Sequence, residues 1–306
     1  MKKKDGFSHK LSSWLDRDNV AGYVFILPFI IGLIVFTTIP FFTSLYLAFT
    51  NYNILSAPKW VGLDNFKKMF FEDDLFWTSF KVTFKFALIQ VPIKLTVALL
   101  VALVLSRSTR LTSFYRAAFY IPSLMGGSVA IALLWKQLFS PKGVINQMLG
   151  FFGLPDRTAW LGNPKTALGT LIALGVWQFG SSMLIFLAAI KNIPQSYHEA
   201  AIVDGAGPVR RFFSITLPML TPIIFFNLIM QTIQALQNFT SAFVITDGGP
   251  MKATYVLGMK LYKEGFSYFK MGYASAISWI IFIVIMLITL VLFATSKWWV
   301  FYGDES

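Results

Sequence analysis

The chain has 306 residues, of which 56% are hydrophobic and only 13% are charged. A soluble domain carries about 25% charged residues, so this composition excludes an ordinary soluble protein and indicates a membrane protein. The absence of cysteine excludes disulfides and thiolate metal sites, and two histidines are too few for a typical histidine metal site. The net charge of +12 is expected of basic loops and termini that face anionic lipid headgroups. No basic segment with interleaved aromatic residues occurs, so nucleic acid is not an expected partner.

Residues 1–22 form a polar, basic N-terminal segment. Phe7, Leu11, Trp14 and Leu15 are spaced as on one face of a helix, which predicts a short amphipathic helix on the membrane surface. A disordered tail is the alternative. The apolar run that follows is too long for a cleaved signal peptide.

Six apolar segments follow, and each is long enough to cross about 30 Å of hydrocarbon as a helix. The first contains Pro28 and Pro40, which membrane helices tolerate when neighbouring groups bond the freed carbonyls. An even number of spans places both termini on one side of the membrane. The predicted spans run from about 23 to 49, 82 to 105, 117 to 139, 166 to 190, 219 to 245 and 273 to 295.

Two lysines lie in or near the second span. Lys85 can extend its ammonium group to the membrane boundary, whereas Lys94 lies deeper and must face protein or water. The spans contain no acidic pairs and no histidine, which enzymes that act within a membrane normally need.

A polar interval at 191–222 separates the fourth and fifth spans. Pro194 can open a short helix, because its missing N–H has no partner at that position anyway. Gly205 can take a positive φ and end this helix, and Pro208 can open a second helix that runs through Ser214. The interval therefore predicts a helical hairpin at the membrane surface.

The hairpin carries a motif with fixed offsets. It reads Glu199-Ala200-Ala201, then Asp204-Gly205-Ala206, then Ile215-Thr216-Leu217-Pro218. This pattern resembles the EAA loop of bacterial ABC importer permeases, which reads E-A-A, three residues, G, nine residues and I-x-L-P. In the loop after the first span, residues 60–66 read W-x-G-L-x-N-F, which resembles the carbohydrate-importing branch of the same family.

The resemblance implies an all-α membrane protein with six transmembrane helices and a type I ABC importer permease fold. The permease domain is then expected at 23–296, with a cytoplasmic coupling-helix hairpin at 191–222. The flanking segments 1–22 and 297–306 are expected in the cytoplasm of a bacterial cell, with the protein in its inner membrane. Lysines and arginines together divide almost equally between the two sides, but the arginines alone favour this orientation.

The resemblance also assigns roles within the hairpin. Ala200 and Ala201 are expected to keep the first helix slim enough to enter a groove on a separate ATPase, where Glu199 meets a basic group. The plainer alternatives are that Glu199 is only solvated and that Gly205 only ends a helix. The expected ATPase-coupling residues are Glu199, Ala200, Ala201, Asp204, Gly205, Leu217 and Pro218.

The fifth span carries a series of amides. Gln231, Gln234 and Gln237 recur every three residues, and Gln231, Gln234 and Asn238 share one helical stripe. Buried amides are unfavourable unless they are hydrogen-bonded. They therefore serve either as contacts between helices or as a polar lining for an uncharged, hydroxyl-rich solute. No charged cluster lies on this stripe, which argues against an ion or amino-acid site.

The middle of the fourth span and the end of the fifth resemble the regions that line the sugar site in the maltose-transporter permease of this family. Trp177 offers a flat face of the kind that stacks on sugar rings. Asn238 matches a site asparagine there, whereas Ala235 and Ser182 differ, so the substrate need not be maltose. The predicted substrate pathway consists of Trp177, Gln178, Ser181, Ser182, Gln231, Gln234 and Asn238.

The sequence contains no G-x-x-x-x-G-K-[ST] phosphate loop and no plausible Ser/His/Asp arrangement. We therefore expect a non-catalytic transport subunit without a cofactor, in which ATP and Mg²⁺ are bound by the partner ATPase. The expected partners are a second homologous permease, an ABC ATPase dimer, an extracellular solute-binding protein, an oligosaccharide and membrane lipid.

An ion-coupled secondary transporter for a neutral polar solute is the main alternative. Such a protein would need an internal repeat and a site for the coupling ion near the midplane, and the sequence shows neither a convincing repeat nor an intramembrane carboxylate. A scaffolding or receptor protein is a third class, but it would leave the amides and the hairpin without a role.

Overall fold

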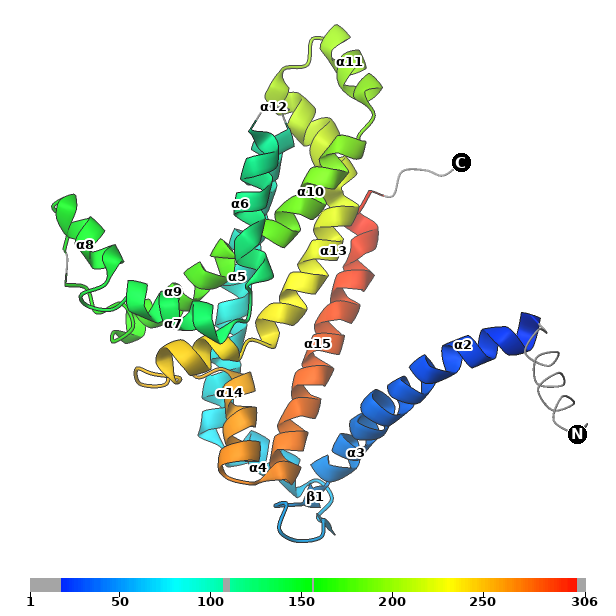
Figure 1. Cartoon of the computed structure of the whole chain (residues 1–306), viewed down its shortest axis with the longest axis vertical. Helices are drawn as coiled ribbons and strands as arrows, with labels where there is room; N and C mark the ends of the chain where they lie inside the picture. Colours follow the sequence, from blue (N-terminus) through cyan, green and yellow to red (C-terminus); the bar gives the residue numbers. More distant parts are fainter. Residues whose placement is uncertain (1–17, 107–110, 156, 302–306) are drawn as a thin grey trace, which may run out of the picture.

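The structure is a computed structural model that describes residues 18–106, 111–155 and 157–301 (Figure 1). Within these ranges the chain is helical apart from loops and one short antiparallel ribbon, in which β1 (Thr50–Asn51) pairs with β2 (Lys59–Trp60). The amphipathic helix predicted around Phe7 to Leu15 lies outside the described residues.

Four helical stretches in the described ranges are long and apolar enough to cross a membrane by themselves. The first joins α2 (Asp18–Leu33), a π-helical segment (Ile34–Thr38) and α3 (Ile39–Ala48). The next is α5 (Asp74–Ser106), and the last is α15 (Met271–Trp299). The remaining one joins α12 (Pro208–Arg211), a π-helical segment (Phe212–Thr216) and α13 (Leu217–Leu236).

Two further helix pairs are sharply bent. α6 (Thr112–Leu124) and α7 (Val129–Leu138) form an angle of 102°, and α9 (Pro164–Trp177) and α10 (Gly180–Asn192) form one of 42°. The predicted spans at 117–139 and 166–190 are therefore not continuous helices. The first break has a local cause, because Gly127 takes a φ of +75°, which glycine adopts without steric cost. The described residues contain four spans, or up to six if each bent pair is one span.

The fifth span ends earlier than the sequence predicts. α13 stops at Leu236, whereas the apolar pattern continues to Ile245. The Ser241 hydroxyl donates to Asn238 Oδ1 at 2.7 Å, and such a local side-chain bond competes with continued helix. The chain then forms a short π-helical segment (Ala242–Thr246) before it turns.

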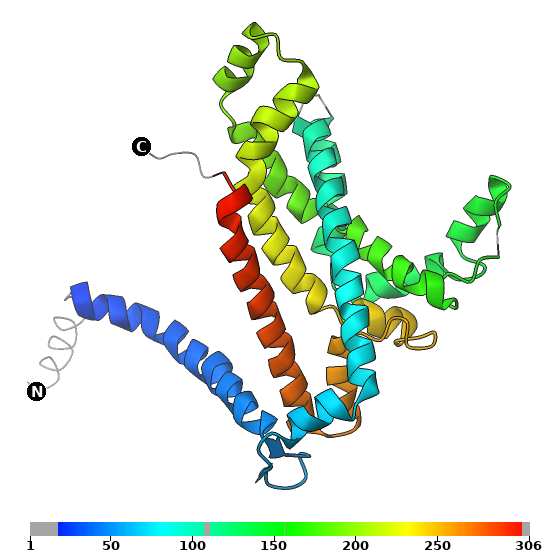
Figure 2. The same ribbon diagram turned by 180° about the vertical axis from the view of Figure 1, so that it is seen from behind.

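The first span stands apart from the other helices at its N-terminal end (Figures 1 and 2). Only its second half packs on the body, where Trp279 Nε1 of α15 donates to Ser44 Oγ at 3.1 Å and the Phe41 ring lies 4.8 Å from the Trp279 ring. Phe25 and Phe29 of α2 are 84% and 70% exposed in this single chain. An apolar helix this exposed needs lipid or another protein against it.

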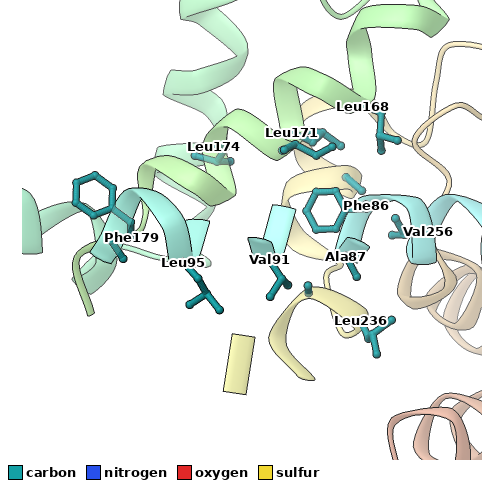
Figure 3. Packing of buried hydrophobic residues seen from close by; sticks show 14 of the residues in the cluster. Phe86, Ala87, Val91, Leu95, Leu168, Leu171, Leu174, Phe179, Leu236 and Val256 are labelled. Carbon is teal, nitrogen blue, oxygen red and sulfur yellow. The ribbon is translucent and has the colours of Figure 1, made fainter. Parts of the chain in front are cut away.

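α5 is the central helix, and it packs most extensively against α10, α13 and α9. Phe86 and Val91 of α5 belong to one buried cluster with Leu171 and Leu174 of α9 and with Leu236 at the end of α13 (Figure 3). The cluster also includes Phe179, which lies at the bend between α9 and α10.

Short elements surround this core. The block W-x-G-L-x-N-F at residues 60–66 leads into α4 (Asp64–Phe71), so that its last three residues form the start of this helix. Asn65 Nδ2 donates to the carbonyl oxygens of Ala48 and Thr50 at 2.8 and 2.9 Å. The block thus fastens the end of the first span to α4. The other short helices are α8 (Val144–Phe151), α11 (Gln195–Val203) and α14 (Leu257–Tyr262), which continues into a π-helical segment (Lys263–Ser267).

A buried ion cluster joins the start of α5 to α14 and α15. The Lys260 side chain is 1% exposed, and its Nζ lies 2.6 Å from Asp73 Oδ2 and 3.3 Å from Glu264 Oε1. The Tyr273 hydroxyl donates to Asp73 Oδ2 at 2.6 Å. Burial raises the pKa of Asp73, but the hydrogen bonds from Lys260 and Tyr273 lower it, and their combined effect is larger. The pKa of Asp73 therefore lies below its ordinary value of 3.8. The stabilisation by this carboxylate is therefore complete above pH 3.8 and is lost as the pH falls through its folded pKa.

Asp73→Asn removes the closest charge partner of the buried Lys260. We expect it to lower the unfolding temperature in detergent, because breaking a buried ion pair costs about 3–5 kcal/mol. Asp74→Asn is the matched control, since Asp74 is exposed and no ion pair of it occurs among the described residues. Equal unfolding temperatures for the two variants would contradict this role of the ion cluster.

Candidate binding cavity and surface hairpin

A cavity of about 440 Å³ lies where the bends of the two broken pairs meet α5 and the end of α13. This volume is within the roughly 300–1,000 Å³ of most small-molecule sites. The residues that line it include Phe86, Gln90, Lys94, Ser123, Gly126, Gly127, Ser128, Gln178, Ser181, Gln231, Gln234, Gln237, Asn238, Thr240 and Ser241.

Close approach of the two broken pairs closes one side of the cavity. The backbone N–H of Ser181, in the first turn of α10, donates to Ser123 Oγ of α6 at 3.1 Å. A Cβ on Gly180 would collide with the backbone of Phe119 and Tyr120, so only glycine allows α10 to start this close to α6. The start of α10 is therefore held directly against α6.

Two polar atoms at the cavity have no hydrogen-bond partner among the described residues. Gln90 Oε1 and Asn238 Nδ2 are buried and lack a hydrogen bond to any described residue. Buried polar groups are nearly always paired, so a missing partner points to water or a ligand. Amides both donate and accept, which suits hydroxyl groups.

Most of the predicted substrate-pathway residues line this cavity. Gln178, Ser181, Gln231, Gln234 and Asn238 do so, from three separate helical segments. This lining favours the ligand role of the amide stripe over a role only in helix contacts.

Two predicted pathway residues lie elsewhere. Ser182 is fully buried and is not among the lining residues. Trp177 is also outside the lining, and its ring lies 5.6 Å from the Trp135 ring. Each is the immediate neighbour of a lining residue, Gln178 or Ser181, but does not itself line the cavity.

The structure adds lining residues that the sequence did not single out for the site. Gln90 and Lys94 lie four residues apart on α5, so they share one helix face, and Ser123 and Ser128 flank the α6–α7 break. For Gln90 and Lys94 a sequence signal exists, since polar side chains deep in an apolar span must face protein or water.

The hairpin lies at the end of α10 that is remote from the α9–α10 bend (Figure 1). Its first helix, α11, ends at Val203 with Asp204 as the C-cap, after which Gly205 takes a φ of +74°. The N–H of Ala206 donates to the Ala201 carbonyl at 2.8 Å, and the N–H of Gly205 donates to the Ile202 carbonyl at 2.9 Å. This pair of bonds is a Schellman motif, which confirms that Gly205 ends the helix and turns the chain.

The hairpin presents an exposed surface with both polar and apolar side chains. No residue of α11 is buried, and Ile202 and Val203 are 55% and 87% exposed. Glu199 is exposed, and its Oε1 accepts a hydrogen bond from Gln195 Nε2 at 2.8 Å. Exposed apolar side chains next to a carboxylate are suited to contact with another protein.

The second half of the hairpin differs from the prediction. The sequence predicted a separate short helix through Ser214, but α12 runs on into α13 as one helical stretch, Pro208–Leu236. Pro218 lacks an N–H and lies in the first turn of α13, directly after the π-helical segment. Leu217 and Pro218 therefore belong to the helix that leads from the hairpin to the cavity.

Comparison with known proteins supplies the family. Residues 94–300 match the binding-protein-dependent transport system inner membrane component family. The chain belongs to this family. That stretch contains the hairpin, both broken helix pairs and most of the cavity lining.

Individual relatives agree over nearly the whole chain. "Probable ABC transporter permease protein YesP" of Bacillus subtilis is 54% identical over 97% of this chain and 96% of its own. "Lactose transport system permease protein LacF" of Rhizobium radiobacter is 32% identical over 91% of this chain and 95% of its own. A bacterial alginate ABC transporter, solved with an alginate pentasaccharide-bound periplasmic protein, contains a chain with a TM-score of 0.80 and 25% identity over 92% of this chain and 96% of that one. The fold is that of a type I ABC importer permease.

Gly175→Ala tests the geometry of the cavity wall. A Cβ at this position would collide with the amide of Gln90, so Gln90 must move. We expect the solute concentration for half-maximal uptake to rise about fivefold, which corresponds to one hydrogen bond of roughly 1 kcal/mol. Gly169→Ala, on the same helix, has nothing within 4 Å of the new Cβ and serves as the control. An unchanged half-maximal concentration for Gly175→Ala would show that Gln90 does not contact the solute.

Proposed function

We propose that this protein is a transmembrane subunit of an ATP-driven ABC importer that translocates an oligosaccharide. The observation that carries the proposal is the cavity, in which amides and hydroxyls from four helical segments converge and two buried amide atoms lack a partner among the described residues. Sugars present many hydroxyls, and amides can both donate to and accept from them.

The relatives support a carbohydrate as the substrate. One of them is named for lactose, and the solved structure is that of an alginate transporter. By analogy, a binding protein outside the cell delivers the solute to this chain.

The hairpin is proposed to couple the permease to a separate ATPase. α11 enters a groove on the ATPase, Glu199 meets a basic group there, and Ala200 and Ala201 keep the helix narrow. The other coupling residues act on the hairpin itself: Gly205 sets the turn after Asp204, while Leu217 and Pro218 connect the turn to α13. ATP and Mg²⁺ bind only to the ATPase, which leaves this subunit non-catalytic.

In the membrane, each bent helix pair is proposed to cross once, which gives six spans in a permease domain at 23–296. The hairpin at 191–222 and the segments 1–22 and 297–306 then lie in the cytoplasm. The exposed apolar face of α2 is covered by lipid and by a second homologous permease, which also completes the wall of the translocation pathway.

Purification of the tagged protein in a mild detergent, followed by mass spectrometry, tests this assembly. We expect a second permease and a P-loop ATPase in the complex, and ATP hydrolysis that rises when the liganded binding protein is added. If the protein instead purifies alone and drives solute uptake into vesicles without ATP, it is an ion-coupled secondary transporter and the proposal fails.

Gly205→Val tests the coupling hairpin. A β-branched residue at a φ of +74° is strained by about 1–2 kcal/mol, so we expect coupled ATP hydrolysis to fall about tenfold while the permease pair still assembles. Gly207→Ala is the control in the same hairpin, because Gly207 has a φ of −67° and nothing lies within 4 Å of the added Cβ. Equal loss in both variants would show that the strained turn is not the cause.

A further inference from the structure

Lys94 is a buried cation that faces the cavity from α5. It is 6% exposed, it lines the cavity, and it lies one helical turn after Gln90 on the same face. No hydrogen bond, ion pair or ring contact of Lys94 occurs within residues 18–106, 111–155 and 157–301. The chain therefore places one ammonium group in the cavity without a protein partner of its own.

Every other described residue that lines the cavity is uncharged. The lining consists of amides, hydroxyls, glycines and apolar side chains, and it includes no carboxylate, histidine or second cation. The described carboxylates that form ion pairs lie on other elements, where Asp73 and Glu264 pair with Lys260, Asp247 pairs with Lys263 and Asp64 pairs with Lys67. None of them belongs to the cavity lining.

An unpaired buried ammonium group is unfavourable by several kcal/mol unless an opposite charge compensates it. The same chain pairs its other deeply buried lysine, Lys260, with two carboxylates at 2.6 and 3.3 Å. The difference between the two lysines indicates that the partner of Lys94 arrives from outside this chain.

Helix ends of both polarities border the cavity. α7 begins directly after Ser128, and Ser181 lies in the first turn of α10, and both serines line the cavity. The first turn of a helix carries a partial positive charge, which favours anions. The last turn of a helix carries the opposite partial charge, and Gln178 and Gln237, the C-caps of α9 and α13, line the same cavity. The helix ends therefore offset one another, and Lys94 is the feature that favours a negatively charged group.

We propose that the oligosaccharide carries a carboxylate, as a uronic acid residue does, and that Lys94 binds this carboxylate while the amides bind ring hydroxyls. This inference rests on the proposed carbohydrate function and narrows it to acidic sugars. The amide stripe of α13 taken alone predicts an uncharged solute, and Lys94 on α5 changes that expectation. A carboxylate suits a single lysine, because a phosphate monoester carries about −1.5 to −2 charges and usually recruits more than one cation.

A carboxylate near Lys94 has one other possible source, which is an acidic side chain of the second permease. In that case Lys94 would hold the permease pair together, and its loss would affect all solutes and the assembly alike. A carboxylate on the sugar makes the opposite prediction, since only acidic solutes would lose uptake and the pair would assemble normally.

The test uses cells that contain the complete importer, and a strain that lacks this chain as the background. The cells receive an equimolar mixture of uronate-containing disaccharides and their carboxyl-reduced, neutral counterparts, and mass spectrometry measures what accumulates. The variants are Lys94→Met, Lys94→Arg and, as the matched control on the same helix, the exposed Lys85→Met. Co-purification of the second permease reports assembly for each variant.

We expect importer-dependent uptake of the acidic disaccharides, about tenfold or greater loss of that uptake in Lys94→Met, and partial recovery in Lys94→Arg, because arginine keeps the charge. Lys85→Met should match the unsubstituted protein. The inference is overturned if the importer accumulates only the neutral sugars, or if Lys94→Met lowers acidic and neutral uptake equally or prevents assembly. If neither class shows importer-dependent uptake, the carbohydrate function itself fails, and the inference fails with it.

Discussion

Hydrocarbon offers no partner to a free backbone N–H or C=O, so a membrane helix can break only where protein or a water-filled cavity satisfies those groups. This constraint governs the centre of the molecule. The α6–α7 pair bends by 102° and the α9–α10 pair by 42°, and the bends face each other across the bond from the Ser181 N–H to Ser123 Oγ. The cavity is the consequence, because two bent helices leave space that straight helices would fill.

α5 holds the cavity together from the opposite side. Its apolar residues Phe86 and Val91 belong to the main core, while Gln90 and Lys94 line the cavity. Gly175 lets Gln90 lie flat against α9, since a Cβ there would collide with the amide. One helix therefore supplies packing, a hydrogen-bonding amide and a cation within three helical turns.

Two helices connect the cavity to the hairpin. α10 starts at the cavity and ends at Asn192, just before the hairpin, and the helical stretch Pro208–Leu236 starts in the hairpin and ends at the cavity. A movement of the hairpin is therefore carried to the cavity by continuous helices rather than by loops. This arrangement gives a physical route by which an ATPase bound at the hairpin could change the shape of the cavity.

The sequence by itself determined the local features. Composition and apolar runs located the membrane segments, Gly205 marked the end of α11, and the amides at Gln231, Gln234 and Asn238 marked a polar face. Each of these follows from residues close together in the chain, whose spacing fixes a face or a turn. Only the tertiary structure decided the size of the bends, the end of α13 at Leu236 and the position of Trp177 and Ser182 outside the cavity. It also placed Lys94 in the same cavity as the amides. Contacts between helices that are far apart in the sequence leave no periodic signal in either helix, so the sequence did not predict this arrangement.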